Sequence, residues 1–282
     1  MTISELKKYF SANLSEIYTE SESTFIFHIF AENILGFNNI QQKQFAEHEI
    51  SAENEKKFYQ IISELLTGKP YLQILGETEF YGMKIFVDEN VLIPRPETEE
   101  LLEIAINKIK SLKLGIQGLK ILDIGTGSGI IPLVLKKHFP QAEVTSIDFS
   151  EKALETAKRN AAFHQLDINF IHADYLNFNL NEQFDIIISN PPYIGIDEES
   201  EIADSVKDFE PKMALFSPTA DALIFYKKIA KDCKTHLIPN GLLFLEINQK
   251  LGTETVELYQ EFSHSELIKD LSENDRFIFG IK

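Results

Sequence analysis

The chain has 282 residues, of which 44% are hydrophobic and 25% charged, and its net charge is −17. This length and composition predict one large or two ordinary domains of a soluble globular protein. The acidic balance disfavours non-specific duplex binding through a broad basic surface and leaves room only for a local basic groove.

The residue pattern does not point to a membrane, a disulfide or a metal. No apolar stretch is long enough to span a bilayer, and no basic-then-apolar leader begins the chain, so we expect a cytoplasmic protein without a membrane partner. The single cysteine, Cys233, cannot form an internal disulfide, and no Cys/His cluster has the spacing of zinc ligands. We therefore expect no metal site.

The first 75 residues have the pattern of helices. Apolar residues recur at three- and four-residue spacing in the segments 4–14, 21–35 and 51–66. Thr19 and Glu22 have the spacing of a capping box for the second segment. No catalytic constellation is visible here, and we predict an N-terminal helical domain over residues 1–75.

A hairpin pattern follows the helices. Between residues 75 and 93 the apolar period changes to two, which is typical of paired strands. The next segment, IPRPETEELL, places Pro96 in the first turn of a helix, and Glu97 favours that N-terminus through the helix dipole. We predict a linking hairpin over residues 76–96 and a second domain over residues 97–282.

From Leu119 onward, strands and helices alternate. Two final strands without a helix between them predict an antiparallel hairpin at one edge of the sheet. The alternation predicts an α/β fold with a mostly parallel sheet, helices on both faces, and ligands at the carboxyl ends of the strands. Strands are expected at 119–125, 142–148, 168–174, 184–190, 241–248, 266–269 and 276–281, and helices at 128–139, 150–164, 221–237 and 251–262.

The first of these strands runs into a glycine-rich turn, GTGSG. Its glycines, Gly125, Gly127 and Gly129, are spaced G-x-G-x-G, with Thr126 and Ser128 between them. Glycines at this point let the backbone approach a ligand closely. A tight turn between strand and helix is the alternative explanation, and it accounts for two of the three glycines.

Acidic residues stand at the ends of the first three strands. Asp148 lies at the distance from the glycines at which a carboxylate accepts the hydroxyls of a ribose, in NAD or S-adenosylmethionine alike. Asp174 and Tyr175 suit the edge and face of an adenine. Asp123 would oppose a pyrophosphate but can help to hold a methionyl ammonium. Each acid alone can be a solvated loop residue, but together they favour S-adenosylmethionine.

The fourth strand ends in Asn190, Pro191, Pro192 and Tyr193. An amide or aromatic amino nitrogen is a poor nucleophile because its lone pair is delocalised. The side-chain oxygen of Asn190 and the carbonyl of Pro191 can accept its two N–H groups more strongly as positive charge develops. Pro192 stiffens this corner, and Tyr193 can stack on the planar group. A simple proline turn is the alternative, but the neighbouring glycine loop and acids favour methyl transfer to a planar nitrogen.

The chain resembles the peptide chain release factor glutamine N5-methyltransferases, the PrmC/HemK group. NPPY alone is shared with DNA and RNA amino-methyltransferases, whereas the segment IPRPETE is specific to the group. Pro132 and Asn248 depart from the group's usual residues, and the aromatic at Tyr175 is often tryptophan in relatives. The matching segments span nearly the full length: LIPRPETEEL, LDIGTGSGI, SIDFSEKALETAKRNA, ISNPPYI, EPKMAL and GLLFLEI.

The resemblance implies a class I S-adenosylmethionine-dependent methyltransferase, Rossmann-like, acting on the glutamine of the Gly-Gly-Gln motif in class 1 release factors. It implies cofactor binding by residues 125–129, Asp148 and Tyr175, and glutamine binding by residues 190–193. The N-terminal helices would dock the release factor, without direct nucleic-acid binding. Arg95 and Glu97 either shape the substrate entrance or only pin the hairpin to the sheet. Glu246, at the end of the fifth strand, can approach the site, but a buried structural acid is favoured.

Two other functions stay open at this point. A DNA or RNA adenine or cytosine amino-methyltransferase would use the same clamp, the pair of acceptor oxygens at Asn190 and Pro191. The acidic balance and the absence of an evident base-recognition domain disfavour this function. A non-catalytic module that keeps the fold for docking would not need the intact clamp.

Overall fold

The computed structural model describes residues 1–112, 118–195, 198 and 203–282. They form two compact units: unit 1 comprises residues 1–76 and 204–209, and unit 2 comprises residues 77–203 and 210–282. The short helix α9 (Asp204–Phe209) therefore packs with the N-terminal helices, far away in sequence. Within unit 1, Gln73 Nε2 donates to the carbonyl oxygen of Phe209 at 2.8 Å.

The three long helices predicted for unit 1 are confirmed as α1 (Ile3–Leu14), α2 (Glu20–Leu35) and α4 (Ala52–Leu66). The predicted capping box is also present, because Thr19 and Glu22 exchange side-chain to backbone hydrogen bonds. The core contains three phenylalanines whose rings lie 5.5 to 6.4 Å apart: Phe10, Phe27 and Phe58. Two short helices, α3 (Asn39–Gln44) and α5 (Tyr71–Leu75), were not predicted, because so few residues show no clear apolar period.

The predicted hairpin is confirmed as β1 (Glu77–Phe80) and β2 (Met83–Phe86). It belongs to unit 2, where one buried side chain of α8 (Glu151–His164) fixes it. Asn160 Oδ1 accepts the N–H of Phe86, and Asn160 Nδ2 donates to the carbonyls of Phe86 and Ser128. The hairpin and the glycine loop are therefore held by the same side chain.

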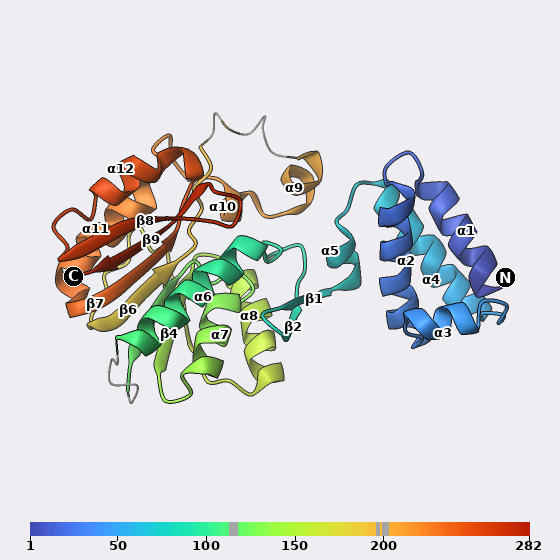
Figure 1. Ribbon diagram of the computed structural model, residues 1–282, viewed down its shortest axis with the longest axis horizontal. Helices are drawn as coiled ribbons and strands as arrows, with labels where there is room; N and C mark the ends of the chain where they lie inside the picture. Colours follow the sequence, from blue (N-terminus) through green and yellow to red (C-terminus); the bar gives the residue numbers. More distant parts are fainter. Residues whose placement is uncertain (113–117, 196–197, 199–202) are drawn as a thin grey trace. The chain divides into compact units, whose positions relative to one another are not determined.

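Unit 2 is built on a seven-stranded sheet of order β5-β4-β3-β6-β7-β9-β8 (Figure 1). The first five strands in this order are parallel, and β9 and β8 form an antiparallel edge. The predicted mostly parallel sheet with an antiparallel edge is thus confirmed. The strands are β3 (Lys120–Ile124), β4 (Glu143–Asp148), β5 (Asn169–His172), β6 (Phe184–Ser189), β7 (Leu237–Glu246), β8 (His264–Lys269) and β9 (Asp275–Ile281).

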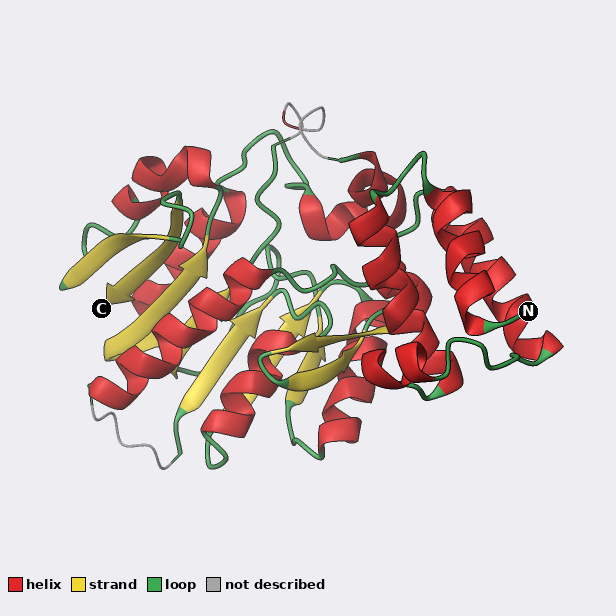
Figure 2. Cartoon of the chain, turned by 45° about the vertical axis from the view of Figure 1, so that its right-hand side comes forward, coloured by secondary structure: helices red, strands yellow, loops and turns green. Residues whose placement is uncertain are grey.

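Helices cover both faces of this sheet, a layering seen in Figures 1 and 2. On one face, α11 (Ile224–His236) packs Tyr226 and Ile229 against Leu122 and Leu243. The opposite face carries α6 (Pro96–Ser111), α7 (Ile130–His138) and α8. Two short helices after β6 and β7 are α10 (Lys212–Leu215) and η2 (Gln249–Leu251), and α12 (Gly252–Glu257) is shorter than predicted.

Within the described part of the chain, no helix is long and apolar enough to cross a membrane.

Strand order reverses on either side of β3, with β4 on one flank and β6 on the other. In open parallel sheets this is where a crevice forms beyond the strands' carboxyl ends.

Candidate active site

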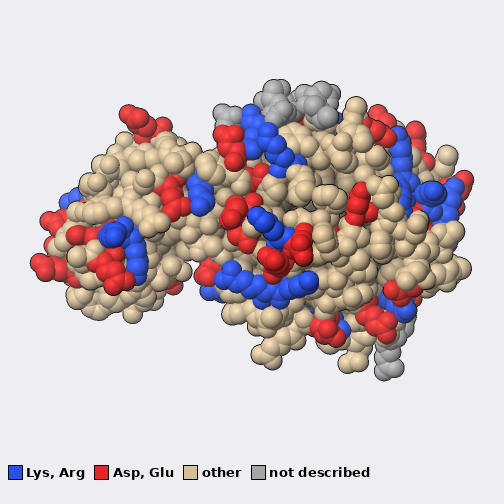
Figure 3. Space-filling view, turned by 180° about the vertical axis from the view of Figure 1, so that it is seen from behind, with Lys and Arg blue, Asp and Glu red and all other residues tan. Residues whose placement is uncertain are grey.

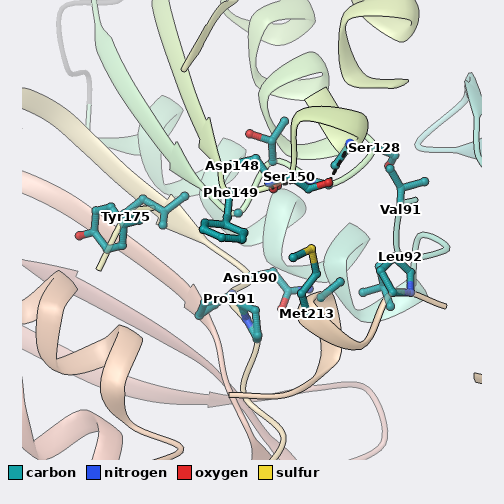
Figure 4. Close-up of a pocket in the computed structure, with 18 of the residues that line it drawn as sticks. Val91, Leu92, Ser128, Asp148, Phe149, Ser150, Tyr175, Asn190, Pro191 and Met213 are labelled. Atoms are coloured by element: carbon teal, nitrogen blue, oxygen red, sulfur yellow. Dashed lines mark hydrogen bonds between the residues drawn. The ribbon is translucent and has the colours of Figure 1, made fainter. Parts of the chain in front are cut away.

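A cavity of about 520 Å³ opens at the carboxyl ends of β3, β4 and β6 (Figure 4). Its size and largely apolar wall are typical of a site for a cofactor-sized molecule. The predicted site residues that line it are Arg95, Gly125, Thr126, Gly127, Ser128, Asp148, Asp174, Tyr175, Asn190, Pro191 and Pro192. Asp123, Gly129, Tyr193 and Glu97 are not part of this wall.

The glycine loop lies directly against the asparagine-proline corner. Gly125 has φ +85°, and a Cβ added there would lie 3.5 Å from the carbonyl oxygen of Asn190. Gly129, at φ +86°, has a different task, because its Cβ would come within 3.1 Å of the Ala157 Cβ. Gly129 thus allows α7 to begin close against α8, whereas Gly125 and Gly127 face the cavity.

Asp148 is held in place by the backbone at the cavity wall. Its Oδ2 accepts the N–H of Gly127 and its Oδ1 the N–H of Ser150, both at 2.8 Å. Burial raises the pKa of this carboxyl, while the N–H donors of Ser150 and Gly127 lower it. Each oxygen keeps a lone pair for a ligand hydroxyl, as a ribose-binding carboxylate requires.

Asp123 lies beneath the loop and is fully buried. Its Oδ2 accepts the hydroxyl of Ser146, which also bonds Thr126, while its Oδ1 has no hydrogen-bond partner among the described residues. Burial raises the pKa of Asp123 to about 7 despite the Ser146 hydrogen bond. Asp123 stands two residues before the first glycine, but it does not line the cavity.

Asp174 and Tyr175, which follow β5, line the cavity with little exposed surface. Tyr175 is only 4% exposed, its hydroxyl donates to Asp232 at 2.8 Å, and Lys228 Nζ lies 4.8 Å from its ring centroid. Asp174 accepts the N–H of Leu176 and so shapes the turn. The ring of Tyr175 can therefore offer an edge to a ligand more readily than a free face.

The corner after β6 brings Asn190, Pro191 and Pro192 to the cavity wall, and in Figure 4 Asn190 and Pro191 lie across from Asp148. Asn190 Nδ2 donates to Thr98 Oγ1 at 3.1 Å, which leaves its Oδ1 free of protein donors among the described residues. The ring of Tyr193 packs against the apolar cluster behind the corner, and its hydroxyl lies 3.4 Å from Glu246 Oε1. Burial raises the pKa of Tyr193.

Arg95 lines the cavity and also helps to hold in place the segment that precedes α6. Its guanidinium forms an ion pair with Glu210 at 2.5 Å, and the second oxygen of Glu210 accepts the N–H of Ile93 at 2.9 Å. Glu210 is 4% exposed. The two roles considered for Arg95 are thus compatible, because the same ion pair that fixes the entry segment places a cation at the cavity wall.

Sequence reasoning missed several apolar side chains of the cavity wall, and two of them, Phe149 and Met213, are 58% and 50% exposed. In Figure 4, Phe149 lies between Asp148 and Pro191, and Met213 lies near Asn190. Phe149 had a detectable signal, an aromatic residue directly after a strand-end acid. Thr98 had none, since only the tertiary structure brings it to Asn190. Glu246, singled out in the sequence at a strand end, is buried and accepts hydrogen bonds from Thr98 and Tyr193.

The residues present fit S-adenosylmethionine. The carboxylate of Asp148 has free lone pairs that suit the hydroxyls of a ribose. The exposed side chains of Phe149 and Met213 suit a flat base. The backbone of the glycine loop allows the cofactor to approach closely. Asp148 and Asp174, the acids in the cavity wall, suit a cation better than a pyrophosphate.

Comparison with known proteins agrees with this geometry. The model of the family described as "Methyltransferase small domain" matches residues 105–207. A release factor glutamine methyltransferase from Flavobacterium psychrophilum is 43% identical over 99% of this chain and 98% of its own length. That from Streptococcus pneumoniae is 40% identical over 80% of this chain and 79% of its own length.

Two solved structures share the fold at low identity. The hMettl16 catalytic domain has a TM-score of 0.55 at 15% identity, covering 82% of each chain. A methyltransferase from Pyrococcus furiosus has a TM-score of 0.51 at 18% identity, covering 78% of this chain and 96% of its own. The fold is that of the class I S-adenosylmethionine-dependent methyltransferases, and the resemblance inferred from the motifs is confirmed. The chain belongs to the release factor glutamine methyltransferase family.

Proposed function

We propose that this protein transfers a methyl group from S-adenosylmethionine to the side-chain amide nitrogen, N5, of the glutamine in the Gly-Gly-Gln motif of class 1 peptide chain release factors. One observation supports this most: the glycine loop and the Asn190 corner line the same cavity, and a Cβ added at Gly125 would lie 3.5 Å from the backbone carbonyl oxygen of Asn190. This closeness supports a cofactor and a substrate amide bound side by side.

S-adenosylmethionine is the cofactor of this family, and when bound it supplies an electrophilic methyl group on a sulfonium. Gly125, Gly127 and Asp148 would hold it, with Phe149 against its base. Asp174 and Tyr175 would border the same base, with Tyr175 contributing a ring edge. We assign Asp123 and Gly129 to supporting the loop from below, since neither lines the cavity.

The chain's own residues activate the glutamine by gripping its amide. Asn190 Oδ1 and the Pro191 carbonyl accept the two N–H groups, and both hydrogen bonds strengthen as the nitrogen becomes positive. Pro192 keeps that carbonyl in place. Because its partly buried ring packs against the apolar cluster, we assign Tyr193 to holding the corner from behind rather than to stacking on the glutamine. The alkylated amide is strongly acidic, so its surplus proton leaves without a dedicated base.

Unit 1 would dock the release factor, as the family resemblance implies. Three of its aromatic side chains, Tyr9, Phe25 and Tyr59, are 41 to 57% exposed and offer apolar contact area. A substrate that acts in translation places the reaction in the cytoplasm.

A nucleic-acid target is the alternative to be tested. On the face seen in Figure 3, lysine and arginine side chains are interspersed with acidic ones rather than gathered into one broad basic surface. With a net charge of −17, the protein would bind a polyanion only against long-range repulsion.

Tritiated methyl transfer decides between these targets. The protein and labelled S-adenosylmethionine are incubated with a class 1 release factor, with the same factor carrying asparagine in place of the motif glutamine, with DNA and with RNA. We expect label only in the unaltered release factor. Label confined to nucleic acid would reverse the choice of substrate, and no label anywhere would favour a non-catalytic docking module.

A further inference from the structure

A chain of hydrogen-bonded side chains runs from the substrate corner into the protein. Asn190 Nδ2 donates to Thr98 Oγ1 at 3.1 Å, and Thr98 Oγ1 donates to Glu246 Oε2 at 2.8 Å. The Tyr193 hydroxyl donates to the other carboxylate oxygen at a longer 3.4 Å. Thr98 lies in the first turn of α6 and Glu246 at the end of β7, and they are 1% and 2% exposed.

The direction of this chain follows from the chemistry of its last member. An ionised carboxylate only accepts hydrogen bonds, so Thr98 must point its single proton at Glu246. The lone pairs of Thr98 are then what faces Asn190, and they can pair only with the N–H₂ end of the carboxamide. The oxygen end of Asn190 is left to face the cavity.

We propose that Thr98 and Glu246 are positioning residues that fix the orientation of the Asn190 carboxamide, so that its oxygen is presented to the substrate amide. This rests on the proposed function, in which that oxygen accepts a glutamine N–H. When Glu246 is protonated it can donate to Thr98, whose own proton is then free to bond Asn190 Oδ1. The carboxamide oxygen is thereby withdrawn, and the clamp loses one of its two acceptors.

The residues around Glu246 bring the pKa of its carboxyl into the pH range in which the enzyme can be assayed. Burial raises its pKa to about 7, opposed by the hydrogen bond from Thr98 and by the charge of Arg276 on β9. Glu97 on α6 raises the pKa further, and the Tyr226 hydroxyl on α11 donates to the backbone carbonyl of Glu246. Arg276 is itself paired with Asp270 at 3.2 Å. The acceptor-only form of Glu246 therefore becomes dominant as the pH rises through about 7, and kcat should rise with it.

The test measures kcat and KM for the full-length protein on a release factor between pH 6 and 8.5, with S-adenosylmethionine affinity measured by calorimetry. Thr98→Val keeps the shape of the side chain but removes the hydroxyl, and we expect kcat to fall ~10- to 100-fold, as for a misplaced catalytic group, with cofactor affinity unchanged. Thr98→Ser should restore most of the rate. Glu246→Gln should lower kcat and abolish its rise near pH 7, because an amide does not titrate.

Thr255→Val is the matched control. Thr255 is also a fully buried threonine whose hydroxyl donates a hydrogen bond, to the carbonyl of Leu251, but it lies on α12 away from the cavity. We expect its kcat and pH profile to match the wild type. A Thr98→Val enzyme with wild-type kcat, or a Glu246→Gln enzyme with the wild-type pH profile, would overturn the inference.

A second measurement does not depend on turnover. With ¹³C-labelled glutamate, NMR should show one carboxyl group titrating near pH 7 that disappears in Glu246→Gln and changes its midpoint in Thr98→Val. The absence of such a signal would overturn the inference even if the variants were slow. If the wild type failed to methylate any release factor, the proposed function would fall, while this titration would still decide the hydrogen-bonded chain.

Discussion

The buried acid Asp123 should make the stability of unit 2 fall as the pH rises. Its pKa is raised from 3.8 to about 7, chiefly because burial disfavours the charged form. The folded protein then binds this proton more tightly than the unfolded chain does. The stabilisation is complete below pH 3.8 and is lost as the pH rises through about 7. Between pH 5 and pH 8 the loss attributable to Asp123 is on the order of 2–3 kcal/mol, from 1.36 kcal/mol for each pKa unit.

The perturbation that isolates this effect is Asp123→Asn. The amide cannot ionise, so the wild type should lose roughly 2–3 kcal/mol more than the variant over that pH range. The amide also brings N–H donors to a position where Oδ1 has no partner among the described residues, which costs about 1–3 kcal/mol at every pH. The difference in pH dependence, rather than the stability at one pH, therefore tests the reasoning.

The assay uses the single cysteine. Cys233 is fully buried in the core of unit 2, so a short pulse of thiol reagent at each urea concentration labels only molecules in which this unit has opened. Asp167→Asn, at an exposed aspartate, controls for the change of charge. Parallel stability curves for wild type and Asp123→Asn between pH 5 and pH 8 would refute the buried-acid argument.

Three further changes test the cavity wall. Asn190→Ala should keep cofactor affinity but lower kcat ~100- to 1000-fold, because its hydrogen bond strengthens only in the transition state; unchanged turnover in a methyl-transfer assay would contradict the clamp. Asp148→Ala should weaken S-adenosylmethionine at least ~10-fold in calorimetry, because it removes a ligand acceptor and releases the Gly127 N–H; an unaltered Kd would reject that role. Phe149→Ala should weaken the cofactor ~5- to 30-fold by removing an apolar wall, whereas Leu271→Ala, at an 89% exposed residue, should not; equal effects would exclude a base contact.

Much of the fold followed from local sequence patterns. The capping box at Thr19 and Glu22, the hairpin before α6 and the antiparallel edge are each set by residues close together in the chain. Periodicity failed for the short helices α3, α5 and α10, which span four to six residues, less than two helical turns. It also overestimated the helix after β7, which ends at Glu257 and continues as turns.

The sequence by itself determined the family, the chemistry and the place of the cavity. Parallel strands end at one edge of a sheet, so the order of the glycine loop, Asp148 and the Asn190 corner along the chain already places them together. Only the tertiary structure decided which side chains face that cavity. Asp123 is buried outside the cavity wall, the Tyr193 ring packs against the apolar cluster, and Thr98 donates a hydrogen bond to Glu246 across 148 residues of sequence. The reason is physical: each strand and helix follows from a residue pattern that is local in the sequence, whereas the hydrogen-bond partner of a buried side chain depends on elements packed from distant parts of the chain.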